Sequence, residues 1–132
     1  MIYLFLFARI LFGGFFLYSG VIHFVKSGMY TQYAAAKKVP VPRVAVLGTG
    51  AMLVVGSLSV LLGVYPTIGL WILVAFLVGT TPMMHRFWSE GEPSQRTMEM
   101  VQFMKNLALL GSTLIIIVLS SYLGPWPFRM VQ

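Results

Sequence analysis

The feature that most limits the fold of this chain is the length of its uncharged stretches. No Asp, Glu, Lys or Arg occurs in residues 10–25, 44–85 or 106–128. A helix of about 20 residues crosses the hydrocarbon core of a bilayer, so uncharged apolar runs of this length predict membrane spans. The middle stretch is long enough for two spans, and Gly63 and Pro66 mark a turn between its halves.

The sequence therefore predicts an all-α fold, an integral membrane four-helix bundle that forms a single domain over residues 1–132. The expected spans are listed here with approximate bounds: 2–24, 43–63, 66–87 and 100–123. Composition agrees, because 58% of residues are hydrophobic and 9% are charged, whereas about a quarter are charged in a soluble domain. A water-soluble globule is excluded. A cleaved signal peptide fits the first stretch poorly, because no basic leader precedes it.

The charged residues predict the orientation in the membrane. The chain has nine Lys and Arg residues and three acidic ones. The basic residues that flank the predicted loops are Lys26, Lys37, Lys38, Arg43, Arg86 and Arg96. Lys and Arg accumulate in cytoplasmic loops, so we expect an inner-membrane protein with both termini, and Arg129, outside. The basic excess then reflects topology, and the expected partners are membrane lipids and other membrane subunits or a second copy, not nucleic acid.

Helical spacing places a set of residues on one face of the first span: Arg9, Gly13, Phe16, Gly20 and His23. Glycines on such a face allow the backbones of two membrane helices to approach closely. Arg9 and His23 are therefore predicted to point into the bundle. The second span carries a similar stripe, for which helix packing is the simpler interpretation: Gly48, Met52, Gly56, Ser59 and Gly63.

The last span carries the most informative polar stripe. Glu99, Gln102 and Asn106 share a face and Lys105 lies beside it, while the third span ends near His85. Ionisable residues inside a membrane are rare and usually face a bundle interior or a wet cavity. The sequence thus predicts a ligand-binding set: Arg9, His23, His85, Glu99, Gln102, Lys105 and Asn106. The alternative is that basic residues near the boundary, Lys105 among them, only extend to the interface.

No cysteine is present, which excludes thiol catalysis, iron–sulfur ligation and cysteine zinc sites. His23 and His85 are expected at similar depths, where two histidines can hold haem b. Two independent interface histidines are the simpler interpretation, so haem b is not expected. The methionines near His85 resemble a Cu(I) ligand set, but methionine is a common apolar filler, and no metal site or intrinsic cofactor is predicted.

Several of these residues resemble the DoxX family. The similarity is carried by Arg9 with Gly13 and Gly20, by Pro40 and Pro42, by the segment 85–88, and by Glu99 followed by residues 103–111. It runs from about residue 7 to about residue 117. The resemblance implies a four-helix membrane bundle with a short interfacial segment between the first two spans, here within residues 25–42 and chiefly 29–38. His23 departs from the family, where Lys is frequent.

The DoxX family is named for a subunit of a thiosulfate:quinone oxidoreductase, and the resemblance implies no agreed catalytic residues. We expect a membrane subunit that binds a quinone or similar lipophilic small molecule within an oxidoreductase complex. His23, His85, Lys105 and Asn106 could donate hydrogen bonds to it, and Glu99 could relay protons. The alternative is a structural or assembly subunit of a larger membrane complex, without chemistry of its own. Whether the chain is an enzyme stays open, and no inverted repeat suggests a transporter.

Overall fold

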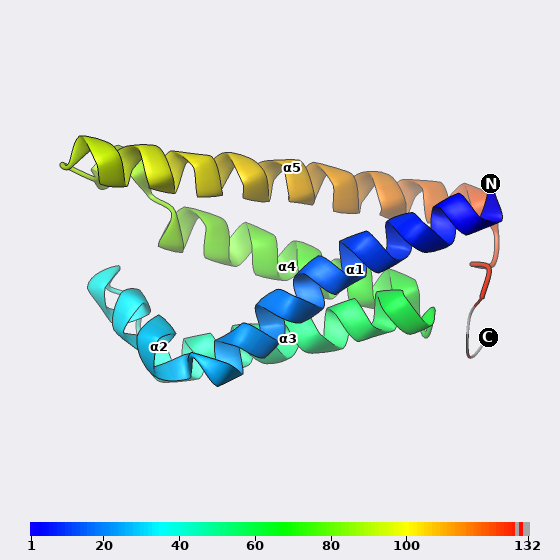
Figure 1. Cartoon of the computed structure of the whole chain (residues 1–132), viewed down its shortest axis with the longest axis horizontal. Helices are drawn as coiled ribbons and strands as arrows, with labels where there is room; N and C mark the ends of the chain where they lie inside the picture. The colour runs from blue at the N-terminus through cyan, green and yellow to red at the C-terminus, as the bar shows by residue number, and fades with distance from the viewer. Residues whose placement is uncertain (129, 131–132) are drawn as a thin grey trace.

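The computed structural model describes residues 1–128 and 130, and within them the chain is helical (Figure 1). The elements are α1 (Ile2–Val25), α2 (Ser27–Ala36), α3 (Pro42–Leu62), α4 (Pro66–Met84), the short 3-10 helix η1 (Phe87–Ser89) and α5 (Pro93–Leu123). In the described part of the chain, four stretches are long and apolar enough to cross a membrane: α1, α3, α4 with η1, and α5. The predicted all-α membrane bundle is confirmed, and a short helix, α2, occupies the segment expected at the interface.

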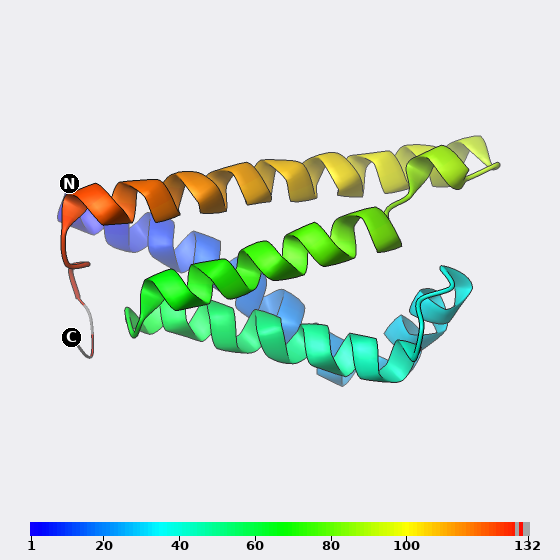
Figure 2. The same cartoon turned by 180° about the vertical axis from the view of Figure 1, so that it is seen from behind.

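The helices form an open bundle in which α3 packs against both α1 and α4, and α5 packs against α4. Figures 1 and 2 show both chain termini at one end of the bundle and α2 at the other. We call the end that holds Met1 and the α3–α4 turn the terminal end. The opposite end, which holds α2 and residues 85–92, is the loop end. The side of the membrane that each end faces remains a prediction.

One predicted boundary differs from the structure. The helix α4 ends at Met84, but the apolar stretch suited to cross the membrane continues through η1 to Ser89 and includes the predicted end near residue 87. The fourth span begins at Pro93 rather than near residue 100. Proline is favoured in the first helical turn, and the backbone N–H of Arg96 bonds to the carbonyl of Glu92 at 2.9 Å. The first two turns of α5 are polar, so apolar length alone did not reveal them.

The predicted inward face of α1 is confirmed, because Arg9, Gly13, Phe16 and Gly20 are buried and His23 is half-buried. A Cβ atom added to Gly20 would lie 2.9 Å from the Cβ of Leu53 on α3. Such a separation is too short for two carbons, so this glycine sets how closely α1 and α3 pack.

The predicted small-residue face of α3 is partly wrong, because Gly48 is exposed. The buried residues of α3 are Val46, Gly50, Leu53, Gly56, Ser57 and Val60. Because α3 lies between α1 and α4, its buried surface is wider than one stripe. That surface includes the larger side chains of α3 as well as its glycines. Small residues still mark the crossing with α4, where a Cβ on Gly69 would lie 2.5 Å from the Cβ of Ser59.

The helix α5 contributes little to the apolar core. That core contains Phe16, Leu53, Leu70, Leu73 and Leu77, from α1, α3 and α4. The buried residues of α5 are Glu99, Asn106 and Thr113, which are all polar and lie on one face. This face is part of the polar stripe predicted from the sequence.

Candidate functional site

A cavity of about 680 Å³ lies at the loop end, between α1, α2, α3, α4 and α5. Much of its wall is apolar and includes Phe16, Met52, Phe76, Leu77 and Leu109. The polar side chains that line it include His23, Tyr30, Tyr33, Thr49, His85, Glu99, Gln102, Lys105 and Asn106. The structure therefore brings six of the seven predicted ligand-binding residues to one cavity. We refer to it as the loop-end cavity.

Glu99 is the centre of the polar wall, and its side chain is 3% exposed. Its Oε2 accepts a hydrogen bond from Nδ1 of His85 at 2.7 Å. Its Oε1 lies 3.0 Å from Nζ of Lys37 and accepts hydrogen bonds from the hydroxyl of Tyr33 and, at 3.3 Å, from Nε2 of Gln95. Four donors from three parts of the chain thus meet on one carboxylate, which satisfies a charge that would otherwise be costly to bury.

Lys37 connects this carboxylate to the loops. Its ammonium group also pairs with Glu90, which lies between η1 and α5, and its backbone carbonyl accepts a hydrogen bond from Nη2 of Arg86 at 2.6 Å. Burial alone would lower the pKa of Lys37, but the hydrogen bonds to Glu90 and Glu99 outweigh it and raise the pKa. The lysine therefore stays charged and ties α2 to the α4–α5 connection.

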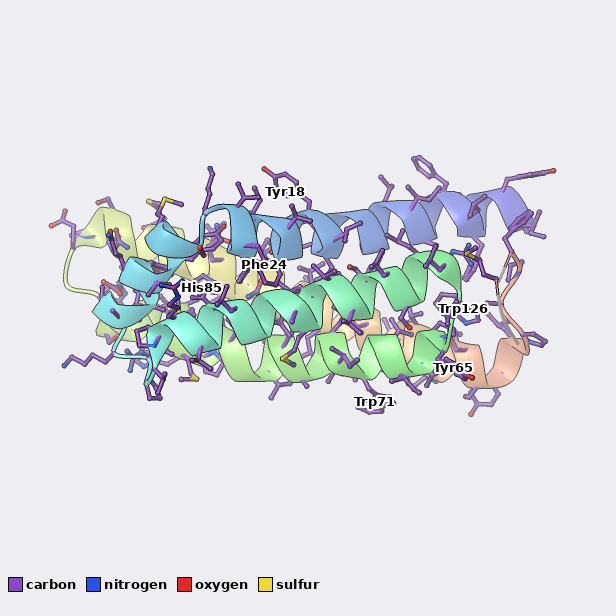
Figure 3. All side chains as sticks on the ribbon, turned by 90° about the horizontal axis from the view of Figure 1, so that it is seen from below. Tyr18, Phe24, Tyr65, Trp71, His85 and Trp126 are labelled. Atoms are coloured by element: carbon purple, nitrogen blue, oxygen red, sulfur yellow. The ribbon has the colours of Figure 1, made fainter. Side chains whose placement is uncertain are left out.

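Tyr33 on α2 points inward. Burial, followed by the hydrogen bond to Glu99, raises the pKa of its phenol above the ordinary value of 10.0. The hydroxyl consequently stays protonated at neutral pH and acts as a donor to Glu99. Figure 3 shows His85 at the loop end, below α2, so that two elements distant in sequence share this carboxylate.

Lys105 and Asn106 lie on α5, six and seven residues after Glu99, and both line the cavity. The buried Nδ2 of Asn106 donates to Oγ1 of Thr81 at 3.1 Å, which fixes α5 to α4. Lys105 donates to the carbonyl oxygen of the Gln102 side chain, and its Nζ lies 5.6 Å from the ring centre of Phe15 on α1. Lys105 thus spans the gap between α1 and α5 on the side of the cavity.

His23 on α1 forms the opposite wall. Its Nδ1 lies 2.7 Å from the backbone carbonyl oxygen of Ser19, and its ring lies 4.9 Å from that of Tyr30. A Cβ on Gly50 would come within 2.8 Å of the Cβ of His23, so the absence of a side chain there lets the histidine lie against α3. The imidazole is therefore held in one orientation.

Arg9 is the predicted residue that the structure does not bring to the cavity. It lies at the terminal end and is 6% exposed. Its Nη1 and Nη2 donate to the backbone carbonyls of Pro127 at 2.9 Å and Phe128 at 3.1 Å. The guanidinium thus holds the segment that follows α5. Arg129, expected on the same side, lies outside the described residues.

Tyr33 and Lys37 belong to the site and were not predicted from the sequence. Of the residues in the predicted ligand-binding set, Glu99 forms an ion-pair contact with His85. Tyr33 and Lys37 are four residues apart, which places them on one face of a helix, and this spacing was the available signal. Nothing in the local pattern of α2 indicated that this face turns toward α5.

The arrangement can hold a small molecule between apolar walls and exchange hydrogen bonds or protons with it at His23, His85 and Glu99. Among residues 1–128 and Met130, no group of three or more His, Asp or Glu side chains is placed to hold a metal ion. The chemistry available to these residues is hydrogen bonding and proton exchange.

Comparison with family models gives one match, in which the DoxX model covers residues 4–86. The matched region contains α1 to α4, His23, Tyr33, Lys37 and His85, and it ends before Glu99 and the rest of α5. The resemblance seen in residues 103–111 therefore lies outside it. Searches of curated proteins and of solved structures gave no match.

Proposed function

Because this chain belongs to the DoxX family and has four helices suited to cross a membrane, we propose that it is a membrane subunit that binds a quinone or a similar lipophilic ring compound. The site is the loop-end cavity. The observation that carries the proposal is the combination of an apolar cavity of about 680 Å³ with a polar wall built around Glu99. Pockets of about 300–1,000 Å³ with few polar groups are typical of small-molecule sites.

The polar wall matches the needs of a ring that carries oxygen substituents. Asn106 and Lys105 retain N–H groups beyond those bonded to Thr81 and Gln102, while Phe16, Met52 and Leu109 provide apolar contact for the ring or its tail. Phe15 and Lys105 line the cavity and are both exposed, and the proposed route from the lipid phase passes between them. In an oxidoreductase complex a partner subunit would supply the electrons, and this chain would hold the compound.

A second role is favoured by the outer surface of α5. Apart from its polar stripe this helix is largely uncovered, with Val101, Ile115 and Val118 each more than half exposed. Lipid can cover such a surface, and so can another membrane subunit. We therefore retain the assembly subunit as the alternative function.

The test measures binding to the purified chain in lipid nanodiscs. The probes are a decyl-tailed benzoquinone and a short-tailed naphthoquinone. A Cβ on Gly79 would meet no atom within 4 Å, and Gly79 lines the cavity, so Gly79→Leu places its side chain there. We expect this variant to weaken binding at least tenfold.

Gly111→Leu is the matched control, because a Cβ there also meets nothing within 4 Å and Gly111 does not line the cavity. It should bind the probes as the wild type does. Equal affinities in all three proteins would overturn the proposed site. If neither probe binds the wild type, the binding function fails, and recovery of the chain with an intact membrane partner would favour the assembly role.

A further inference from the structure

The two histidines of the loop-end cavity differ in what holds their Nδ1 atoms. His23 faces the backbone carbonyl of Ser19, and His85 faces the carboxylate of Glu99. A backbone carbonyl accepts hydrogen bonds and cannot donate them, so Nδ1 of His23 carries the proton. In a neutral imidazole the other nitrogen, Nε2, is then a hydrogen-bond acceptor.

The surroundings of His23 supply no counter-charge. No ion pair joins it to a carboxylate of the described chain, in which Glu90 and Glu99 pair with Lys37 or His85 and Glu92 lies in the loop before α5. Its ring contacts instead are Tyr30 and Phe76. In its neutral form the ring therefore presents a lone pair at Nε2.

No hydrogen bond to Nε2 of His23 is formed within residues 1–128 and Met130. Among the hydroxyls that line the cavity, Tyr33 donates to Glu99 and Thr49 donates to the carbonyls of Ala45 and Val46, and no hydrogen bond of the described chain joins the Tyr30 hydroxyl to His23. A half-buried acceptor on the cavity wall thus lacks a donor from the protein. A ligand that supplies one gains a hydrogen bond there.

Building on the proposed function, we propose that the loop-end cavity selects the reduced, hydroxyl-bearing form of its ring compound, the quinol, and that Nε2 of His23 is the atom that makes the selection. A quinol hydroxyl donates a hydrogen bond to this nitrogen. A quinone carbonyl has no proton to donate, so its oxygen lone pairs face the lone pair of Nε2 and are repelled.

The experiment compares the two redox forms of one probe, a decyl-tailed benzoquinone and its quinol, under anaerobic conditions in nanodiscs. We expect the wild type to bind the quinol about tenfold more tightly than the quinone. The quinol gains one hydrogen bond at Nε2, whereas the quinone meets a repulsion there. His23→Phe keeps an aromatic ring without nitrogen and should bring the ratio close to one. His23→Lys presents donors alone and should reverse the preference.

Thermal unfolding of both variants checks that the bundle is intact, and Gly111→Leu, outside the cavity, is the control whose ratio should stay above one. A wild-type ratio near one, or a ratio that His23→Phe and His23→Lys leave unchanged, overturns this inference while the binding function stands. Failure of both redox forms to bind the wild type overturns the proposed function itself.

Discussion

The two ends of the bundle each bury a charged side chain, and they satisfy it in different ways. At the terminal end the guanidinium of Arg9 is bonded to the backbone carbonyls of Pro127 and Phe128. At the loop end the carboxylate of Glu99 is bonded to side chains, which are Tyr33, Lys37, His85 and Gln95. Both charges are nearly inaccessible, so the difference lies in the kind of partner.

That difference separates a structural role from a functional one. Backbone carbonyls neither gain nor lose protons at ordinary pH, and they move only with the chain that carries them. Imidazole and carboxyl groups exchange protons and adjust their rotamers when a ligand arrives. The loop-end cavity adjoins the second kind of network. We therefore interpret Arg9 as a structural contact that holds the C-terminal segment and Glu99 as part of the proposed binding site.

The largest effect is expected when Glu99 is removed. Glu99→Leu leaves Tyr33 without its buried acceptor and Lys37 with Glu90 as its remaining acidic partner, and breaking a buried ion pair costs about 3–5 kcal/mol. We expect a decrease of this size in the free energy of unfolding, measured by SDS titration in mixed micelles with far-ultraviolet circular dichroism. Glu92→Gln, in the exposed loop, should change it by less than about 0.5 kcal/mol. Equal stability of Glu99→Leu and the wild type would refute the central place of Glu99.

A smaller and more local effect is expected at the terminal end. Arg9→Leu removes two charge-assisted hydrogen bonds and should cost about 1.5–3 kcal/mol. The segment after α5 should loosen, which is measured by aqueous quenching of Trp126 fluorescence with Trp71 and Trp88 replaced by Phe. Arg9→Lys should restore part of the protection.

Substitutions at the two ends should also differ in their effect on ligand affinity. Arg9→Leu should leave the affinity for the benzoquinone probe within twofold of the wild type, because Arg9 does not line the cavity. A tenfold loss of affinity in Arg9→Leu would contradict the assignment of Arg9 to a structural role separate from the proposed binding site.

The smallest effect is expected at the side of the cavity. Phe15→Leu removes the ring that faces the ammonium of Lys105, a contact worth about 0.5–1 kcal/mol at an exposed site. We expect a loss of stability of at most this size, together with a few-fold faster release of the quinone probe in stopped-flow measurements. Phe7→Leu, on an exposed part of α1, is the control and should leave the release rate unchanged. Unchanged release in Phe15→Leu would place the route elsewhere.

The spans and the inward face of α1 follow from the sequence because they depend on local properties. Apolar length without charge defines a membrane helix, and the spacing of Arg9, Gly13, Phe16 and Gly20 defines which side of it is buried. The same periodicity identified Glu99 and Asn106 as inward-facing. The less accurate feature was the start of α5, where Pro93 begins the helix within a polar segment.

The partners of the buried charges were decided by tertiary structure alone. Sequence spacing relates residues of one helix to each other, but it does not say that Lys37 of the interhelical segment reaches Glu99, or that residues after α5 fold back to Arg9. Those contacts depend on how α2 and the C-terminal segment lie against the bundle. The sequence by itself thus determined a membrane bundle in which Arg9 and Glu99 face inward. The packing of its helices placed the two at opposite ends, and made one of them part of a cavity.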